Sequence, residues 1–347
     1  MYPNHLAVLR WIATCVAAIL SVGTPSLEHA EHPFTGAPAA AAALPTITEY
    51  QLPRPNAFPH DPAVGADGIV WYTDQNNSFI GRLDPATGKI TDTPTPTPAS
   101  GPHGIVVAPD LGVWYTAQRS GLVGHLDPRT MKITEFRLPA NASAPHTPLL
   151  VGNKVWFTAQ TNNTYDELDP ATGKVRTFMC PTPRSLPYGI RLAPDGSIWI
   201  ALFGTNKLGR VNASTGAMQE IVIPDERARP RRIEVAPNGM VYYTDYARGY
   251  LGRFDPKSGE FKEWRSPGGD GSAPYGIGYA PDGRVWYNES GSGTMVGFDP
   301  VTEKMDAVKI PTAGSVVRNV SVDAKRHIIW LAESGVQRLG RLELGAR

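Results

Sequence analysis

Apolar residues along this chain occur in short runs rather than at helical spacing. From residue 45 onward, runs of four to seven residues rich in β-branched and aromatic side chains alternate with turn sequences that contain Gly, Pro or Asp-Gly. β-Branched and aromatic residues favour strands, and Asp-Gly or Thr-Gly pairs favour tight reversals. This part of the sequence keeps no 3.6-residue apolar period without a Gly or Pro interruption. The pattern predicts an all-β protein built from many short strands.

One strand pattern is repeated seven times. The aromatic residue that opens a Trp-Tyr-Thr-like segment recurs at Trp71, Trp114, Trp156, Trp199, Tyr242, Trp286 and Trp330. In each copy a Pro-His/Tyr-Gly-Ile-like segment precedes it, and Gly-Arg-Leu-Asp-Pro-like and Ile-Thr-Glu-Phe-like segments follow. Each copy predicts a four-stranded antiparallel sheet, and such sheets bury their faces by packing against one another. We predict a seven-bladed β-propeller over residues 45–347.

The two ends of the repeat region complement each other. An outer-strand segment at residues 47–53 precedes the first copy, and the repeats end on a third-strand segment at residues 339–342. We expect the N-terminal strand to complete the last blade, because this pairing removes the exposed edge of a three-stranded blade.

Residues 1–44 differ in composition from the repeats. Arg10 precedes an apolar run at residues 11–22, and sequence rich in Pro, Glu and Ala follows up to Ala43. The run is about a dozen residues long, whereas a membrane span needs roughly 20, so we expect a signal peptide and a spacer rather than an anchor. The predicted location is secreted or periplasmic, with no membrane span.

Charge and cysteine content limit the chemistry. The chain has 33 Lys and Arg residues against 32 Asp and Glu, so no overall field would attract nucleic acid. Cys15 lies in the predicted signal peptide, and we expect Cys180 to be a passive strand residue. The sequence contains no Gly-rich phosphate loop, nucleophile elbow or HExxH motif. We expect a monomer that recognises its ligand locally.

Chemistry-bearing side chains recur at two positions of the repeat. The second residue of each first strand, which follows a Pro in six copies and Val317 in the seventh, is, in order, His60, His103, His146, Tyr188, Arg231, Tyr275 and Arg318. The residue three places after the aromatic is Asp74, Ala117, Ala159, Leu202, Asp245, Glu289 and Glu333. The start of the first strand and the end of the second lie at the same rim of an antiparallel sheet. We therefore expect both sets to lie at one face around the central channel.

Candidate roles follow from side-chain chemistry. Imidazole and phenol groups transfer protons, so the candidate catalytic residues are His60, His103, His146 and Tyr275. Guanidinium and phenol groups suit an anionic or aromatic ligand, so Tyr188, Arg231 and Arg318 are candidate ligand-binding residues. The carboxylates of Asp74, Glu289 and Glu333 suit a divalent cation such as Mg²⁺. The structural alternative is that the rings pack on Pro and bond to a neighbouring blade, and that the carboxylates accept backbone N–H groups.

The repeated motifs resemble those of the streptogramin B lyase family, also called virginiamycin B lyases. The run Pro-His-Gly-Ile, Val-Trp-Tyr-Thr, Gly-Arg-Leu-Asp-Pro-Ala-Thr-Gly and Ile-Thr-Glu-Phe-x-Leu-Pro carries the resemblance over residues 45–343. It implies a seven-bladed propeller and a Mg²⁺-dependent elimination that linearises a cyclic depsipeptide antibiotic. It also implies a catalytic His after the Pro in each of the last two blades, and two metal-binding Glu in the last blade. The matching positions hold Tyr275, Arg318 and Val316, with Glu333 near the second Glu position.

Three classes of function follow. The leading hypothesis is an exported, metal-dependent carbon–oxygen lyase for a cyclic depsipeptide or lactone-like molecule, with His103 or His60 as base and Glu333 or Asp74 assisting the cation. The rival is a non-catalytic propeller that binds a small molecule, peptide, protein or glycan at the channel rim. A six-bladed sugar-lactone hydrolase is the third, and the seven repeats and missing metal-ligand pattern argue against it.

Overall fold

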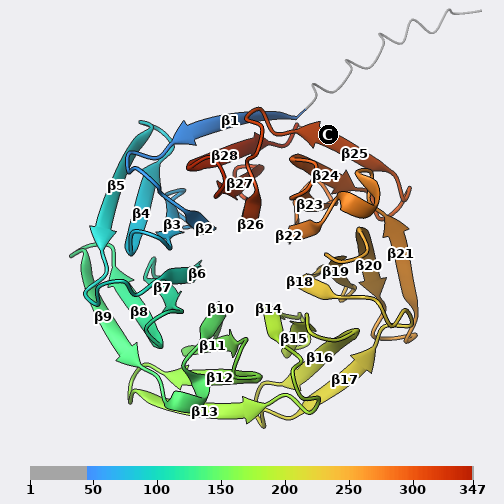
Figure 1. Cartoon of the computed structure of the whole chain (residues 1–347), viewed down its shortest axis with the longest axis horizontal. Helices are drawn as coiled ribbons and strands as arrows, with labels where there is room; N and C mark the ends of the chain where they lie inside the picture. The colour runs from blue at the N-terminus through green and yellow to red at the C-terminus, as the bar shows by residue number, and fades with distance from the viewer. Residues whose placement is uncertain (1–44, 346–347) are drawn as a thin grey trace, which may run out of the picture. The chain divides into compact units, whose positions relative to one another are not determined.

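Seven four-stranded antiparallel sheets surround a central axis in the computed structural model, which describes residues 45–345 (Figure 1). In blades one to six the strands follow one another from the channel outward in chain order. This arrangement confirms the predicted seven-bladed propeller.

The first three blades contain twelve strands. They are β2 (Pro59–Val64), β3 (Val70–Asp74), β4 (Phe79–Asp84) and β5 (Lys89–Pro94) in blade one; β6 (Pro102–Val107), β7 (Val113–Ala117), β8 (Leu122–Asp127) and β9 (Lys132–Arg137) in blade two; and β10 (Pro145–Val151), β11 (Lys154–Ala159), β12 (Thr164–Asp169) and β13 (Lys174–Met179) in blade three. The short 3₁₀ helix η1 (Ala140–Ala142) lies between blades two and three.

The last four blades contain the other sixteen strands. They are β14 (Pro187–Leu192), β15 (Ser197–Leu202), β16 (Lys207–Asn212) and β17 (Met218–Val222) in blade four; β18 (Pro230–Val235), β19 (Val241–Asp245), β20 (Tyr250–Phe254) and β21 (Phe261–Arg265) in blade five; β22 (Pro274–Tyr279), β23 (Val285–Glu289), β24 (Thr294–Phe298) and β25 (Met305–Lys309) in blade six; and β26 (Val317–Asp323), β27 (Ile328–Glu333), β28 (Arg338–Glu343) and β1 (Thr46–Gln51) in blade seven. The 3₁₀ helix η2 (Gly269–Gly271) precedes β22.

The N-terminal strand closes the ring as predicted. β1 pairs antiparallel with β28, from Thr46 opposite Glu343 to Gln51 opposite Arg338. Its Glu49 accepts a hydrogen bond from the Thr312 backbone N–H at 2.9 Å, and Glu135 and Glu220 bind the linker residues Thr97 and Thr182 in the same way in blades two and four. β1 therefore makes the contacts of an ordinary fourth strand.

The hydrophobic core lies between neighbouring blades. One cluster joins Trp199 and Leu208 of blade four to Ile233 and Tyr243 of blade five, and similar clusters fill the other blade boundaries. Within blade one, Tyr72 follows the recurring Trp, and its ring lies over Gly81 of the neighbouring strand β4. A Cβ on Gly81 would lie 1.9 Å from that ring. Glycine in the Gly-Arg-Leu motif thus makes room for the tyrosine ring.

The other expectations about the chain concern its termini and Cys180. Cys180 is buried and forms no disulfide. No helix within residues 45–345 is long and apolar enough to cross a membrane. The predicted signal peptide and spacer, residues 1–44, lie outside the described residues.

Candidate functional site

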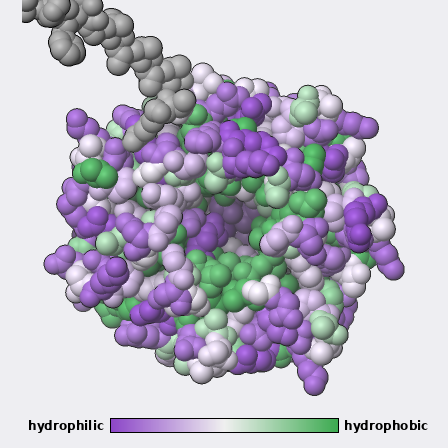
Figure 2. Space-filling view, turned by 180° about the vertical axis from the view of Figure 1, so that it is seen from behind, coloured by the Kyte–Doolittle hydropathy of each residue, from purple (hydrophilic) through white to green (hydrophobic). Residues whose placement is uncertain are grey.

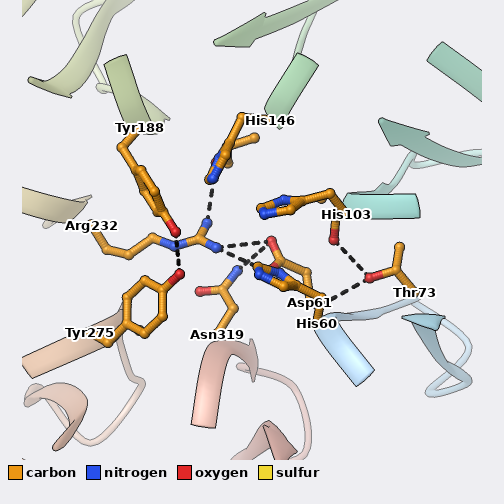
Figure 3. A network of polar contacts seen from close by, with 12 residues as sticks. His60, Asp61, Thr73, His103, His146, Tyr188, Arg232, Tyr275 and Asn319 are labelled. Atoms are coloured by element: carbon orange, nitrogen blue, oxygen red, sulfur yellow. Dashed lines mark hydrogen bonds and ion pairs between the residues drawn. The ribbon is translucent and has the colours of Figure 1, made fainter. Parts of the chain in front are cut away.

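The second residues of the seven inner strands, six of which open with Pro and the last with Val317, lie together around the channel, and we call them the first layer. Each opening Pro is paired with the last residue of the second strand, as Pro59 is with Asp74, so both predicted sets belong to one rim. The layer contains five nearly buried rings and two half-buried arginines: His60, His103, His146, Tyr188, Tyr275, Arg231 and Arg318. Figure 3 shows the rings converging on the channel from successive blades.

The rings of the first layer contact one another from blade to blade. The centroids of His60 and His103 are 3.7 Å apart, and those of His103 and His146 are 3.9 Å apart. The His146 ring lies 3.9 Å from that of Tyr188, whose hydroxyl hydrogen-bonds the hydroxyl of Tyr275. The structure therefore brings together all three predicted histidines and both tyrosines.

A threonine of the aromatic strand positions each of several first-layer residues. The Thr73 hydroxyl donates to the His103 carbonyl in the next blade at 2.7 Å, and accepts from the backbone N–H of Asp61 in its own blade at 3.1 Å. Thr116, Thr158 and Thr244 hold the carbonyls of His146, Tyr188 and Tyr275 in the same way. The backbone of the first layer is therefore fixed through main-chain groups, whatever side chain it carries.

A second layer lies one residue further along each inner strand, and we did not predict it. It consists of Asp61, Gly104, Thr147, Gly189, Arg232, Gly276 and Asn319. At Gly189 a Cβ would lie 2.9 Å from the Cα of Arg232, so glycine allows the inner strands of blades four and five to approach. The signal in the sequence is the polar residue that replaces Gly in the Pro-x-Gly motif of four copies.

Arg232 crosses the channel to bind Asp61. Its Nη2 lies 3.0 Å from Asp61 Oδ1, its Nη1 donates to Thr147 Oγ1 at 3.3 Å, and Asn319 Nδ2 donates to Asp61 Oδ2 at 2.9 Å (Figure 3). Asp61 and Arg232 are each 1% exposed. A buried ion pair with this many hydrogen bonds joins blades one, three, five and seven through the channel.

Electrostatics fix the protonation states of this network. Burial acts to raise the pKa of Asp61, but the Arg232 charge and the hydrogen bond from His60 outweigh it and hold that pKa well below its usual range. Asp61 is therefore ionised, and the His60 Nδ1–H donates to it at 2.8 Å. Burial also lowers the pKa of His60, and lowers that of His103 and His146 further. The three imidazoles are neutral near pH 7.

Arg231 occupies an aromatic cage. Its guanidinium carbon lies 4.0 Å from the ring centroid of Tyr275, 4.2 Å from that of Tyr246 and 4.9 Å from that of Phe203. Its Nη2 donates to the Tyr188 hydroxyl at 3.3 Å. Within residues 45–345 no carboxylate forms an ion pair with Arg231, so aromatic faces and a neutral hydroxyl are its partners.

The carboxylates at the ends of the second strands bind the linkers between blades. Asp74 Oδ1 accepts from the Phe58 backbone N–H at 3.0 Å, and Asp245 Oδ1 accepts from that of Arg229 at 3.1 Å. Glu289 Oε1 accepts from the Gly268 backbone N–H at 2.8 Å. These contacts agree with the structural alternative for the carboxylates, in which they accept backbone N–H groups.

Glu333 belongs to the closure of the ring. It is fully buried, and a Cβ on Gly340 would lie 2.3 Å from its Oε1, so its carboxyl group lies across β28. Burial and the charge of nearby Glu49 raise the pKa of Glu333 to about 8. Glu333 is therefore protonated near pH 7.

The predicted metal ligands come from three neighbouring blades of the ring. Asp74, Glu289 and Glu333 belong to blades one, six and seven. Across the described part of the chain, no three His, Cys, Asp or Glu side chains are grouped so that they could hold a metal ion. The catalytic, ligand-binding and metal-binding roles remain predictions.

A cavity of about 330 Å³ lies along the channel beyond the Asp61–Arg232 pair. The second half of the inner strands lines it, including Pro62, Ile105, Pro148 and Val320, and Asn319 reaches it from the second layer. Figure 2, seen from behind Figure 1, shows a hollow at the centre of the ring with hydrophobic residues around part of its edge.

Comparisons with known proteins agree with the propeller. A family model described as the virginiamycin B lyase family matches residues 42–202 and 150–347. The crystal structure of selenomethionine-substituted virginiamycin B lyase from Staphylococcus aureus is 24% identical, with a TM-score of 0.79 over 86% of this chain and 99% of that chain. A catalytically inactive variant of the Staphylococcus aureus enzyme, solved with quinupristin, is 24% identical, with a TM-score of 0.80 over 86% and 99%.

The same fold also occurs in a different protein. The hydrazine synthase of Kuenenia stuttgartiensis is 14% identical, with a TM-score of 0.71 over 83% of this chain and 96% of that chain. No curated protein sequence matches the chain. The likeness to these solved structures concerns the fold alone, but the family model spans nearly all of the repeats. The chain belongs to the virginiamycin B lyase family.

Proposed function

We propose that this propeller binds a small molecule or peptide at the first layer, without the metal-dependent ring opening that the family resemblance implies. The observation that carries the proposal is the chemistry of the sector where the family's catalytic groups would lie. Tyr275, Arg318 and Val316 occupy those positions, and the channel beside them is filled by the Arg232–Asp61 pair. Phenol, guanidinium and alkyl groups suit recognition rather than cation binding.

The residues present do not fit the Mg²⁺ site of the family. Mg²⁺ is bound by oxygen ligands, usually including carboxylates, in an octahedral arrangement. Val316 supplies no such oxygen, and Glu333 is fully buried near Glu49. We therefore derive no step through a metal ion.

The test asks whether the protein opens the ring of quinupristin. The purified protein is incubated with quinupristin with and without Mg²⁺, and liquid chromatography with mass spectrometry separates the cyclic compound from a linear isomer of equal mass. We expect no linear isomer under either condition, while the virginiamycin B lyase of Staphylococcus aureus, as the positive control, forms it. Accumulation of a linear isomer above the protein-free rate would overturn the proposal.

A second candidate function is elimination with His60 as base, and the Asp61–His60 contact favours it. Because Asp61 is ionised and accepts from Nδ1, the lone pair of His60 lies on Nε2, the arrangement of a general base. If a linear isomer forms, His60→Ala should abolish it and His103→Ala should reduce it less. Equal loss in both variants would contradict a specific role for His60.

Export is part of the same proposal. The apolar run at residues 11–22 supports a signal peptide, and its short length supports release rather than anchoring. Expression in a bacterial host followed by fractionation and N-terminal sequencing tests this. We expect a periplasmic or secreted protein that begins between residues 23 and 45, and an intact Met1 in the cytoplasm would contradict it.

A further inference from the structure

The two first-layer arginines lack the carboxylate partner that several other partly buried arginines of this propeller have. Arg191, Arg248 and Arg338 each form an ion pair with a carboxylate: Arg191 with Glu234, Arg248 with Asp245, and Arg338 with Glu49. In place of a carboxylate, the guanidinium group of Arg231 contacts aromatic rings and one neutral hydroxyl. The guanidinium carbon of Arg318 lies 5.4 Å from the ring centroid of Phe58. Among residues 45–345, Arg318 has no hydrogen bond or ion pair.

Both guanidinium groups retain unused hydrogen-bonding capacity. Nε of Arg231 and Nε of Arg318 are buried without an acceptor in the described part of the chain. A buried donor without an acceptor costs free energy, so each of these groups favours a ligand that supplies one.

No carboxylate of the first or second layer is paired with Arg231 or Arg318. The first and second layers contain the guanidinium groups of Arg231, Arg232 and Arg318 but a single carboxylate, that of Asp61, which is bound to Arg232. With the imidazoles neutral, three positive charges face one negative charge, an excess of two. The carboxylates at the strand ends are held elsewhere: Asp74, Asp245 and Glu289 accept from the linkers, and none of them forms an ion pair with Arg231 or Arg318.

The field of these arginines reaches across the layer. Besides burial, the charges of Arg232 and Arg318 contribute to the lowered pKa of His60, and those of Arg232 and Arg231 contribute to that of His146. A field that disfavours a cationic imidazole favours an anion at the same place.

The surroundings of the two arginines are aromatic. Phe203 and Tyr246, both half-buried, line the cage of Arg231, and Phe58, also half-buried, lies beside Arg318. These rings offer faces for stacking, while the guanidinium forks match the two oxygens of a carboxylate.

We infer that the ligand of the first layer is an aromatic carboxylate, whose anionic group binds an unpaired arginine of that layer, Arg231 or Arg318, and whose ring stacks on the aromatic side chains beside that arginine. The inference rests on the proposed binding function and narrows it to one chemical class.

The experiment uses phenylacetate as the probe, with its uncharged analogue phenylacetamide as the matched control, and ligand-observed NMR or calorimetry as the readout. A ligand of about ten heavy atoms should bind with a Kd on the order of 1–10 mM. Phenylacetamide, phenethylamine and acetate should each bind at least tenfold more weakly. Added salt should weaken phenylacetate binding, because charge contributes to it.

Variants locate the site. Arg231→Gln or Arg318→Gln should weaken phenylacetate binding by tenfold or more, and the variant that does so identifies the arginine of the site. Substitution of that arginine by lysine should weaken binding by less, because lysine keeps the charge but loses the fork. Arg265→Gln is the matched control, since Arg265 is an exposed arginine of the outer strand β21. Arg318 has no polar partner to lose, so Arg318→Gln should retain the wild-type melting temperature even if the caged Arg231 variant does not.

Each outcome decides the inference. Equal binding of phenylacetate and phenylacetamide, unchanged affinity in both Gln variants, or no saturable phenylacetate binding below about 30 mM would overturn it. If quinupristin binds without turnover while phenylacetate does not bind, the proposed binding function stands and the carboxylate inference fails. N-acetylphenylalanine distinguishes a peptide C-terminus from a free aromatic acid: whichever of it and phenylacetate binds more tightly identifies the source, and either result retains the carboxylate.

Discussion

Arg231 and Arg232 are adjacent in the chain but lie in opposite electrostatic environments. Arg232 is 1% exposed and is neutralised by Asp61 from across the channel, whereas Arg231 is half-buried among aromatic rings. The irregular register between Pro230 and Ile233 at the start of β18 assigns the two side chains to different layers. One residue along a strand therefore separates a charge that stabilises the fold from a charge that is available to a ligand.

The buried ion pair predicts a large effect on stability. Arg232→Met leaves Asp61 ionised and buried without its cation, so the free energy of unfolding should fall by about 3–5 kcal/mol, measured by urea denaturation. Arg265→Met, which removes the exposed pair with Asp270, should cost less than about 1 kcal/mol. Similar losses in the two variants would contradict the role of the channel network.

At the scale of the strands, two carboxyl groups lie close together where β1 completes blade seven. Glu333 of β27 reaches across Gly340 of β28 to Glu49 of β1. In blade one the corresponding crossing is made by the Tyr72 hydroxyl, which donates to Asp92 at 2.6 Å. A protonated Glu333 can replace the tyrosine as donor, and an ionised Glu333 cannot.

This pairing predicts that stability depends on pH. The pKa of Glu333 is raised above its unfolded value, so between about pH 4.5 and pH 8 the native state holds a proton that the unfolded state has lost. Stability from this group should therefore fall as pH rises through that window, with a slope of at most about 1.4 kcal/mol per pH unit. In Glu333→Gln the amide N–H₂ remains a donor, so its advantage over the wild type should grow from pH 5 to pH 8.5. Parallel unfolding curves across that range would refute this account.

At the scale of the whole molecule, the seven sequence repeats made the fold predictable. The positions at which the repeats differ made part of the site impossible to predict. The seven aromatic strands and the complementary chain ends were sufficient to predict the blades and their closure. The first layer could be predicted because a Pro marks it in six of the seven copies and the repeat spacing marks it in the seventh, where Val317 precedes Arg318. The second layer was missed because three of its positions are Gly and the others share no residue type. The pairing of Glu49 with Glu333 could not be predicted because nearly the whole chain separates them and because one of them must be protonated.

Ring closure predicts the effect of removing β1. The comparison is between a protein that begins at residue 45 and one from which residues 45–54 have also been deleted. The deletion would remove both the fourth strand of blade seven and the buried Leu52. We expect insoluble protein, because β28 would present an unpaired edge and the ring would stay open. Solubility and the melting temperature are the measurements, with Glu49→Gln as a control that retains the strand. A truncated protein that melts like the intact one would disprove the closure.

The threonine contacts of the first layer have a consequence for how such a rim can diversify. Thr73, Thr116, Thr158 and Thr244 hold the carbonyl of the rim residue in the next blade, not its side chain. At these four positions the contact therefore does not depend on which side chain the rim residue carries. Substitutions there can change the chemistry of the rim, and with it the specificity for a ligand, without a change of fold.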